Sequence, residues 1–159
     1  MIPGLFHPLK KINGFLGPFG LSVRADSDAS AAPSKDSVGS YEAGSVFTKE
    51  ILVHVFPDRI RTGLEENGST GGYASELALT LYHEVGHALM EQLVDYSENI
   101  PEFYPSMTAK FGNRFFDVFN DDNLSEEDIV EAFAQRFHAG KGSLLQRCWE
   151  ESSKILETL

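Results

Sequence analysis

The sequence is poor in cysteine, in basic residues and in long apolar runs, and each shortage excludes a class of protein. The single cysteine, Cys148, cannot form an intrachain disulfide, and it rules out a zinc site built from several cysteines. Lys and Arg number 13 against 24 Asp and Glu, and the net charge of -11 argues against a nucleic-acid partner or an anionic membrane surface. No apolar run approaches the roughly 20 residues that cross a bilayer. What remains is a chain of 159 residues, the size of one globular domain.

The first 40 residues carry little to bury. We expect a short helix and a mobile linker over residues 1–40, followed by one folded domain over residues 41–159. An apolar stretch over 12–23 follows two lysines, as in a secretory signal, but glycine, proline and asparagine interrupt it. Two aspartates also fall where a signal cleavage region is usually neutral. We therefore expect a cytoplasmic protein, with secretion as the alternative.

Hydrophobic periodicity predicts an α+β domain in which a small, mostly antiparallel sheet packs on a long helix, with further helices on the C-terminal side. Residues 50–56 are rich in β-branched and aromatic side chains, as in a strand, and Pro57 ends them. A polar, glycine-rich loop is expected over 63–72. Shorter extended pieces are expected at 20–23 and 40–47. Apolar residues at helical spacing, with Ser125 and Asp128 as a capping box, predict these helices: 73–94, 106–119, 125–140 and 144–159.

Two histidines and a glutamate stand at the spacing of a zinc hydrolase motif in the segment HEVGH at 83–87. On a helix, His83 and His87 project from one face a turn apart, so both rings can hold one Zn²⁺. Glu84 lies beside them. It is placed to act as general base toward a metal-activated water, and then to pass the proton to the leaving amine. The small Gly86 is expected to leave room beside the metal.

A third ligand must come from elsewhere, because the residues after His87 lack the glycine and third histidine of the pattern HExxHxxGxxH. Glu127 and Glu131, one turn apart in the expected helix 125–140, are the candidates. Glu127 would lie in the first turn, where an acid also complements the helix dipole, whereas Glu131 lies deeper, beside apolar residues. We favour Glu131 and keep Glu127 open.

The two motifs together resemble a known family of zinc peptidases. HEVGHA at 83–88, followed by EAFAQRF at 131–137, is similar to the gluzincins related to the anthrax lethal factor catalytic domain. Gln135 stands where that family often has an acid. The order of elements also resembles the ImmA/IrrE-like zinc peptidases, which leaves Glu127 in play. The lethal-factor resemblance implies a zincin-like fold with these site residues: zinc ligands His83, His87 and Glu131, and Glu84 as general base.

We therefore expect a zinc-dependent peptidase, an endopeptidase rather than an exopeptidase, with Zn²⁺ as cofactor and a peptide or protein as substrate. One alternative is a zincin-fold binding module with little or no turnover. Another is a regulatory or effector protease that needs a partner. The intact Glu84 favours chemistry, because a purely structural zinc site has no use for it.

In the zincin-like fold that the resemblance implies, the strand 50–56 would form the edge of the sheet beside the cleft, where an extended substrate would pair with its backbone. His54 in this strand could then face the cleft. For the residue that stabilises the oxyanion, Tyr41, Tyr82 and Tyr104 are equal candidates in the sequence.

Overall fold

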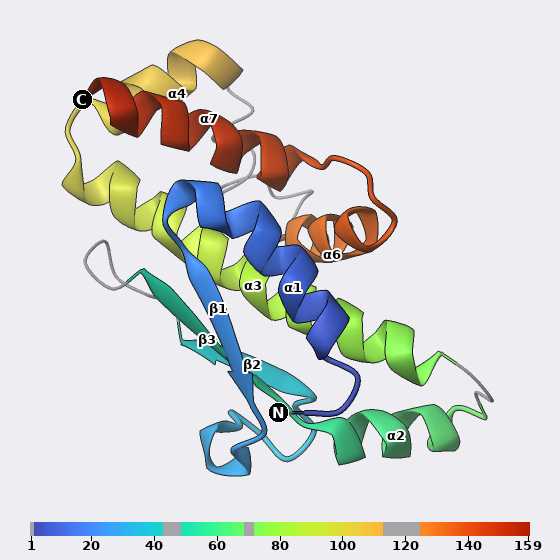
Figure 1. The fold of residues 1–159 in the computed structure, drawn as a ribbon. Coiled ribbons are helices and arrows are strands. Elements are labelled where there is room, and N and C mark those ends of the chain that lie inside the picture. The colour runs from blue at the N-terminus through green and yellow to red at the C-terminus, as the bar shows by residue number, and fades with distance from the viewer. Residues whose placement is uncertain (1, 43–48, 69–71, 113–124) are drawn as a thin grey trace.

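The structure is a computed structural model that describes residues 2–42, 49–68, 72–112 and 125–159 (Figure 1). Helix α1 (Phe6–Leu16) and strand β1 (Ser22–Asp26) come first, followed by strands β2 (Gly39–Glu42) and β3 (Glu50–Val55). The remaining helices in this part of the chain follow in order: α2 (Pro57–Glu66), α3 (Tyr73–Asn99), α4 (Phe103–Phe111), α6 (Glu126–His138) and α7 (Leu144–Thr158). The chain is an α+β protein, as the periodicity predicted.

The sheet is mixed, and not mostly antiparallel as we predicted. Its strand order is β1-β3-β2, with β1 parallel to β3 and β2 antiparallel to it. Val23 pairs with Ile51 in the parallel ladder, and Tyr41 pairs with Val53 in the antiparallel one. β3 is thus the central strand, and the prediction that residues 50–56 form the edge is wrong. Strand propensity identifies a strand but does not specify its neighbours.

The helices agree with the predicted pattern, with one exception. α3 begins at Tyr73 as expected and continues to Asn99, while α6 and α7 lie within two residues of their predicted bounds. α4 covers the start of the predicted helix 106–119, whose end lies outside the described residues. Helix α2 was not predicted, because Pro57 both ends the strand and occupies the first helical turn, where its absent N–H is not needed.

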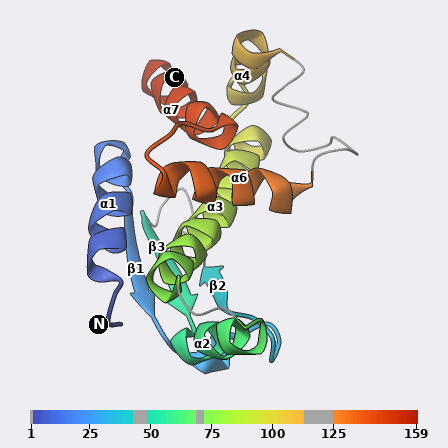
Figure 2. The ribbon, with the colours of Figure 1, turned by 90° about the vertical axis from the view of Figure 1, so that its right-hand side faces the viewer.

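Helix α3 lies at the centre of the fold (Figures 1 and 2). It packs on the sheet together with α1, α6 crosses it, and α4 and α7 pack along its C-terminal part. A stripe of large aliphatic side chains on α3 has no exposed surface, and its members recur every four residues: Leu77, Leu81, Val85, Leu89 and Leu93. Burial of these side chains contributes roughly 1.5–3 kcal/mol per residue, which holds the helix in place.

The first 40 residues share one hydrophobic core with the rest of the described chain. Ile12 and Leu16 of α1 and Val23 of β1 are buried in it. The Asn13 side chain joins the two elements, since its amide donates to the Val23 carbonyl at 3.1 Å and its oxygen accepts from the Val23 N–H at 2.7 Å. Packing therefore continues across residue 40, where we had placed a domain boundary.

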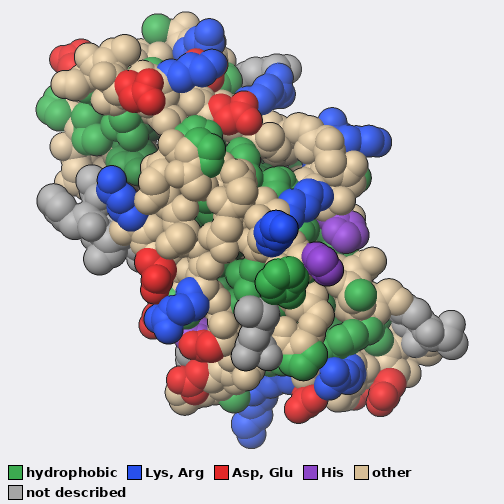
Figure 3. Space-filling view, in the orientation of Figure 1, with side chains coloured by type: hydrophobic (Ala, Val, Ile, Leu, Met, Phe, Trp, Pro, Cys, Tyr) green, Lys and Arg blue, Asp and Glu red, His purple; other side chains and the backbone are tan. Residues whose placement is uncertain are grey.

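Acidic and basic side chains are interspersed on the face of the molecule that Figure 3 shows, with apolar side chains between them. The net charge of -11 is thus not gathered into one acidic patch on this face. Among the described residues, no helix is long and apolar enough to span a membrane.

Candidate metal centre

His83 and His87 lie on the face of α3 that α6 crosses. Their Nε2 atoms are 3.2 Å apart, and the rings meet edge to face with centroids 4.8 Å apart. His87 is buried, whereas the side chain of His83 is 21% exposed. The four-residue spacing therefore brings the two imidazoles together on one face of α3, as helical geometry requires.

Glu127 completes this group from the first turn of α6. One of its carboxylate oxygens lies 2.8 Å from Nε2 of His87, and the other lies 3.0 Å from Nε2 of His83. The predicted capping box is confirmed: the Asp128 N–H donates to Oγ of Ser125 at 3.2 Å, and the Ser125 N–H donates to the Asp128 carboxylate at 3.3 Å. The cap stabilises the first turn of α6, which would otherwise fray, and so fixes the backbone from which the Glu127 side chain extends.

The donor atoms of His83, His87 and Glu127 converge as the ligands of one ion do. They lie within 4.8 Å of one another. Ligands about 2.0–2.1 Å from a tetrahedral zinc lie roughly 3.3–3.4 Å apart, close to the 3.2 Å between the two imidazole nitrogens. Two imidazoles and one carboxylate also form a donor set that leaves a fourth position open in catalytic sites. The group can therefore hold a metal ion.

Glu131 lies on the other side of the His83 ring. One of its carboxylate oxygens is 3.0 Å from Nδ1 of His83, and Gln135 donates to the other oxygen at 2.9 Å. The burial that we expected for Glu131 is not found, because its side chain is 53% exposed. A carboxylate at the second ring nitrogen of a histidine fixes the tautomer and the orientation of the ring, which leaves Nε2 free to bind a metal.

Glu84 lies against the strand β2. A Cβ atom added at Gly39 would come within 3.1 Å of Cγ of Glu84 and 2.9 Å of Cγ2 of Thr80, so the strand approaches the helix closely because residue 39 is a glycine. Burial raises the pKa of Glu84 to about 7; the charge of His83 opposes this shift and that of Glu127 adds to it. A carboxyl group with a pKa near neutrality can both accept and return a proton.

A cleft runs along α3 past these residues. It consists of two cavities of about 430 and 360 Å³ whose walls share Gly39, His83 and Glu84. Residues between Pro33 and Tyr41 line one side of the cleft, and α6 lines the other. Because Glu84 lines both cavities, it lies where the two halves of the cleft meet. The wall formed by this segment was not predicted, because a short polar segment with three serines gives no signal that it lies over a site.

Tyr41 is the one of the three candidate tyrosines that lines the cleft. Its ring stacks on that of His87, with centroids 5.6 Å apart and an angle of 5° between the planes, and its hydroxyl is hydrogen-bonded to Glu91. Burial, reinforced by the charge of Glu91, raises the pKa of Tyr41 to about 12, so the hydroxyl remains a donor. Tyr82 is buried in the core, and Tyr104 belongs to α4.

The stacked ring of Tyr41 should tighten metal binding by restricting the orientation of His87. We expect Tyr41→Ala to weaken metal affinity by about tenfold, in the range found when partners of a ligating histidine are removed. Tyr41→Phe keeps the stacked ring and should retain most of the affinity. Competition with a coloured chelator measures the metal affinity of both variants and of the wild type. Equal affinities for Tyr41→Ala and the wild type would contradict this role of Tyr41.

Gly86 makes room for α6, and not for a metal as we had expected. A Cβ atom at this position would lie 2.9 Å from Cγ1 of Val130 and 3.1 Å from Cδ1 of Phe133, and both of these side chains are fully buried. The glycine thus sets the distance at which α3 and α6 cross. It therefore also sets how close Glu127 comes to the histidines.

Gly86→Ala should destabilise the protein and weaken its metal binding together. An added methyl group in a packed helix crossing forces a backbone shift, which we expect to lower the free energy of unfolding by about 1–3 kcal/mol. Gly63→Ala in α2 is the matched control, since no atom lies within 4 Å of the added Cβ and alanine favours a helix. Urea denaturation of the metal-free proteins measures the difference, and equal stability of the two variants would refute this role of Gly86.

His54 belongs to the interior of the sheet and lines neither half of the cleft. Its side chain is buried, with Nδ1 2.5 Å from the Asp26 carboxylate on β1 and Nε2 3.6 Å from the Glu42 carboxylate on β2. The hydrogen bond to His54 lowers the pKa of Asp26. His54 thus connects the three strands.

The chain has no match among known proteins in three comparisons: no family model, no curated protein and no solved structure matches it. The resemblance to the gluzincins therefore rests on the two sequence motifs.

Proposed function

We propose that this protein is a zinc-dependent peptidase, with His83, His87 and Glu127 as the metal ligands and Glu84 as the general base. One observation carries the proposal: two imidazole nitrogens and a carboxylate converge within 4.8 Å, beside a glutamate that lies at the junction of a two-part cleft. A purely structural metal site needs neither that glutamate nor the cleft. The gluzincin-like motifs and the zincin-like fold that they imply agree with this reaction.

The residues around the group divide the chemical work. A bound zinc ion would polarise the peptide carbonyl and lower the pKa of water. Glu84 accepts the proton of the attacking water at its carboxylate and delivers it to the leaving amine. Glu131 holds the His83 ring through Nδ1, and Gln135 in turn holds Glu131. In this assignment Glu131 is a positioning residue, and the ligand role that the resemblance implies for it passes to Glu127.

Metal analysis combined with a peptide screen tests the proposal. After reconstitution with zinc and removal of the excess, the wild-type protein should hold one zinc per chain, and it should cleave members of a mixed peptide pool internally. The same pool with Glu84→Gln protein should remain intact. Absence of bound zinc would overturn the proposal, whereas bound zinc without cleavage of any peptide would favour a binding module or a protease that requires a partner.

A further inference from the structure

One wall of the cleft is a segment whose first half, before β2, burial does not hold in place. We call this segment, residues 33–41, the strap. Asp36 to Gly39 line one half of the cleft, and Pro33 together with Gly39 to Tyr41 line the other. Residues 33–36 of the strap are exposed, and Val38 keeps 40% of its surface exposed. An apolar core therefore does not fix this part of the wall, and its position depends on polar contacts.

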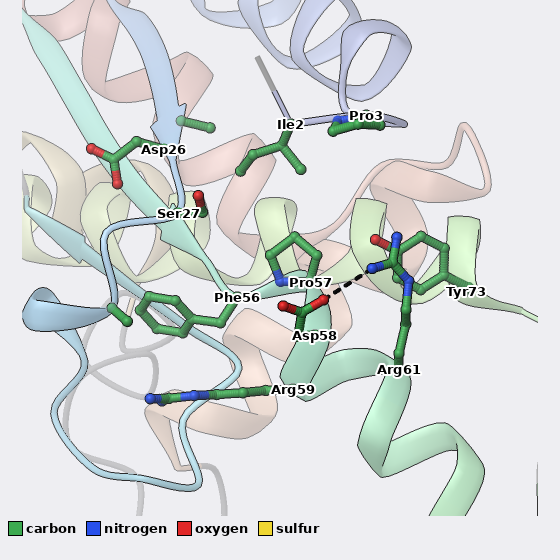
Figure 4. A pocket seen from close by; sticks show the side chains of 12 residues that line it. Ile2, Pro3, Asp26, Ser27, Phe56, Pro57, Asp58, Arg59, Arg61 and Tyr73 are labelled. Atoms are coloured by element: carbon green, nitrogen blue, oxygen red, sulfur yellow. Dashed lines mark hydrogen bonds and ion pairs between the residues drawn. The ribbon is translucent and has the colours of Figure 1, made fainter.

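Arg59 of α2 supplies such contacts. Its Nη1 donates to the carbonyl oxygen of Ser37 at 2.9 Å and to that of Ser34 at 3.1 Å. The guanidinium itself lies over the ring of Phe56, 4.8 Å from the ring centre, and points away from Asp58 and Arg61 (Figure 4). The backbone N–H of Phe56 donates to the next carbonyl of the strap, that of Val38, at 2.9 Å.

We propose that Arg59 is a positioning residue of the cleft, which holds the strap at the distance from α3 that substrate binding requires. This inference rests on the proposed peptidase function. Arg59 lines a separate cavity of about 610 Å³ and no part of the cleft, so it acts through the strap alone. Two hydrogen bonds from a charged donor fix the segment immediately before Gly39, whose backbone lies against Glu84.

Arg61 provides a matched control on the same helix. It lines the same cavity as Arg59, but it pairs with Asp58 at 3.0 Å and lies over the ring of Tyr73, 4.5 Å from the centre. Its removal takes away the same charge from the same helix without removing a bond to the strap. A difference between Arg59→Ala and Arg61→Ala therefore reports on the strap and not on net charge.

Hydrogen exchange tests the inference without relying on activity. In the zinc-reconstituted full chain, we expect the β2 amides, Gly39–Glu42, to exchange about tenfold faster in Arg59→Ala than in the wild type, since a hydrogen bond from a charged group contributes at least that factor. Amides of α6 and α7 should keep their protection. Arg61→Ala should match the wild type throughout, and Arg59→Lys, which retains a charged donor, should recover part of the protection.

The kinetic test separates positioning from general stability. With a cleaved peptide from the pool, Arg59→Ala should raise KM by about tenfold with a smaller change in kcat, because the wall that holds the substrate loosens while the general base stays in place. Bound zinc should remain at one per chain. Equal exchange at β2 in Arg59→Ala and Arg61→Ala would overturn the inference and leave the peptidase proposal intact. A wild type without zinc or cleavage would overturn the peptidase function, and the KM role with it, while the exchange rates still decide whether Arg59 holds the strap.

Discussion

Replacing Glu127 with alanine should abolish stoichiometric zinc binding, whereas replacing Glu131 with alanine should only weaken it. Glu127 presents its two oxygens to the Nε2 atoms of both histidines at 2.8 and 3.0 Å. Of the histidine nitrogens, Glu131 meets only Nδ1 of His83, whose Nε2 faces Glu127. Loss of a positioning partner typically weakens metal affinity 10- to 100-fold. We therefore expect a loss in that range for Glu131→Ala and a larger one for Glu127→Ala.

Chelator competition and metal analysis after gel filtration distinguish these two glutamates. Glu157→Ala, which removes an exposed acid from α7, controls for the change in net charge and should bind zinc as the wild type does. The reverse order, with zinc lost in Glu131→Ala and kept in Glu127→Ala, would restore the ligand set that the gluzincin resemblance implies. It would also require the first turns of α6 to move relative to α3 when the metal binds.

Glu84→Gln should remove peptide hydrolysis while metal binding persists. The amide has nearly the shape of the carboxylate and keeps its place against Gly39, but it cannot accept a proton. General-base catalysis contributes about 10²–10⁴-fold, and we expect kcat/KM to fall by that factor. Initial rates on a peptide cleaved by the wild type, measured at equal zinc occupancy, give the comparison.

Glu76→Gln is the companion variant for this experiment. Glu76 lies two helical turns earlier on α3 and lines one half of the same cleft, but it does not border the metal group. It should retain hydrolysis within a fewfold of the wild type. Comparable losses in both variants would mean that the acidity of the cleft, and not a proton acceptor at position 84, supports the reaction. Full activity in Glu84→Gln would remove the general base from the proposal.

Local chemistry made several features of the protein predictable. Helix α6 begins where Ser125 and Asp128 form a capping box, because this interaction involves residues three apart. The apolar repeat of α3 predicted the helix, since side chains four apart share one face. For the same reason the sequence alone brought His83 and His87 together, which is the part of the candidate site that depends on a single helix.

Contacts between elements could not be predicted in this way. The order β1-β3-β2 and the edge position of β2 depend on which strands pair, and strand propensity does not encode the partner. The role of Gly86 depends on α6 crossing α3 at that residue. Tyr41 reaches His87 only because β2 packs on α3.

The choice between Glu127 and Glu131 also separates what local sequence determines from what contacts between elements determine. Both lie on one face of one helix, so the sequence reduced the third ligand to these two. The preference for Glu131 depended on its expected burial and on the motif resemblance, and the structure does not bury its side chain. Which carboxylate meets the Nε2 atoms depends on where α6 crosses α3 and at what angle. The sequence by itself therefore determined the residue types of the candidate site and the two helices that carry them. The tertiary packing of α6 and β2 on α3 decided which atoms face one another, because distances between segments remote in sequence are set by packing and not by local propensity.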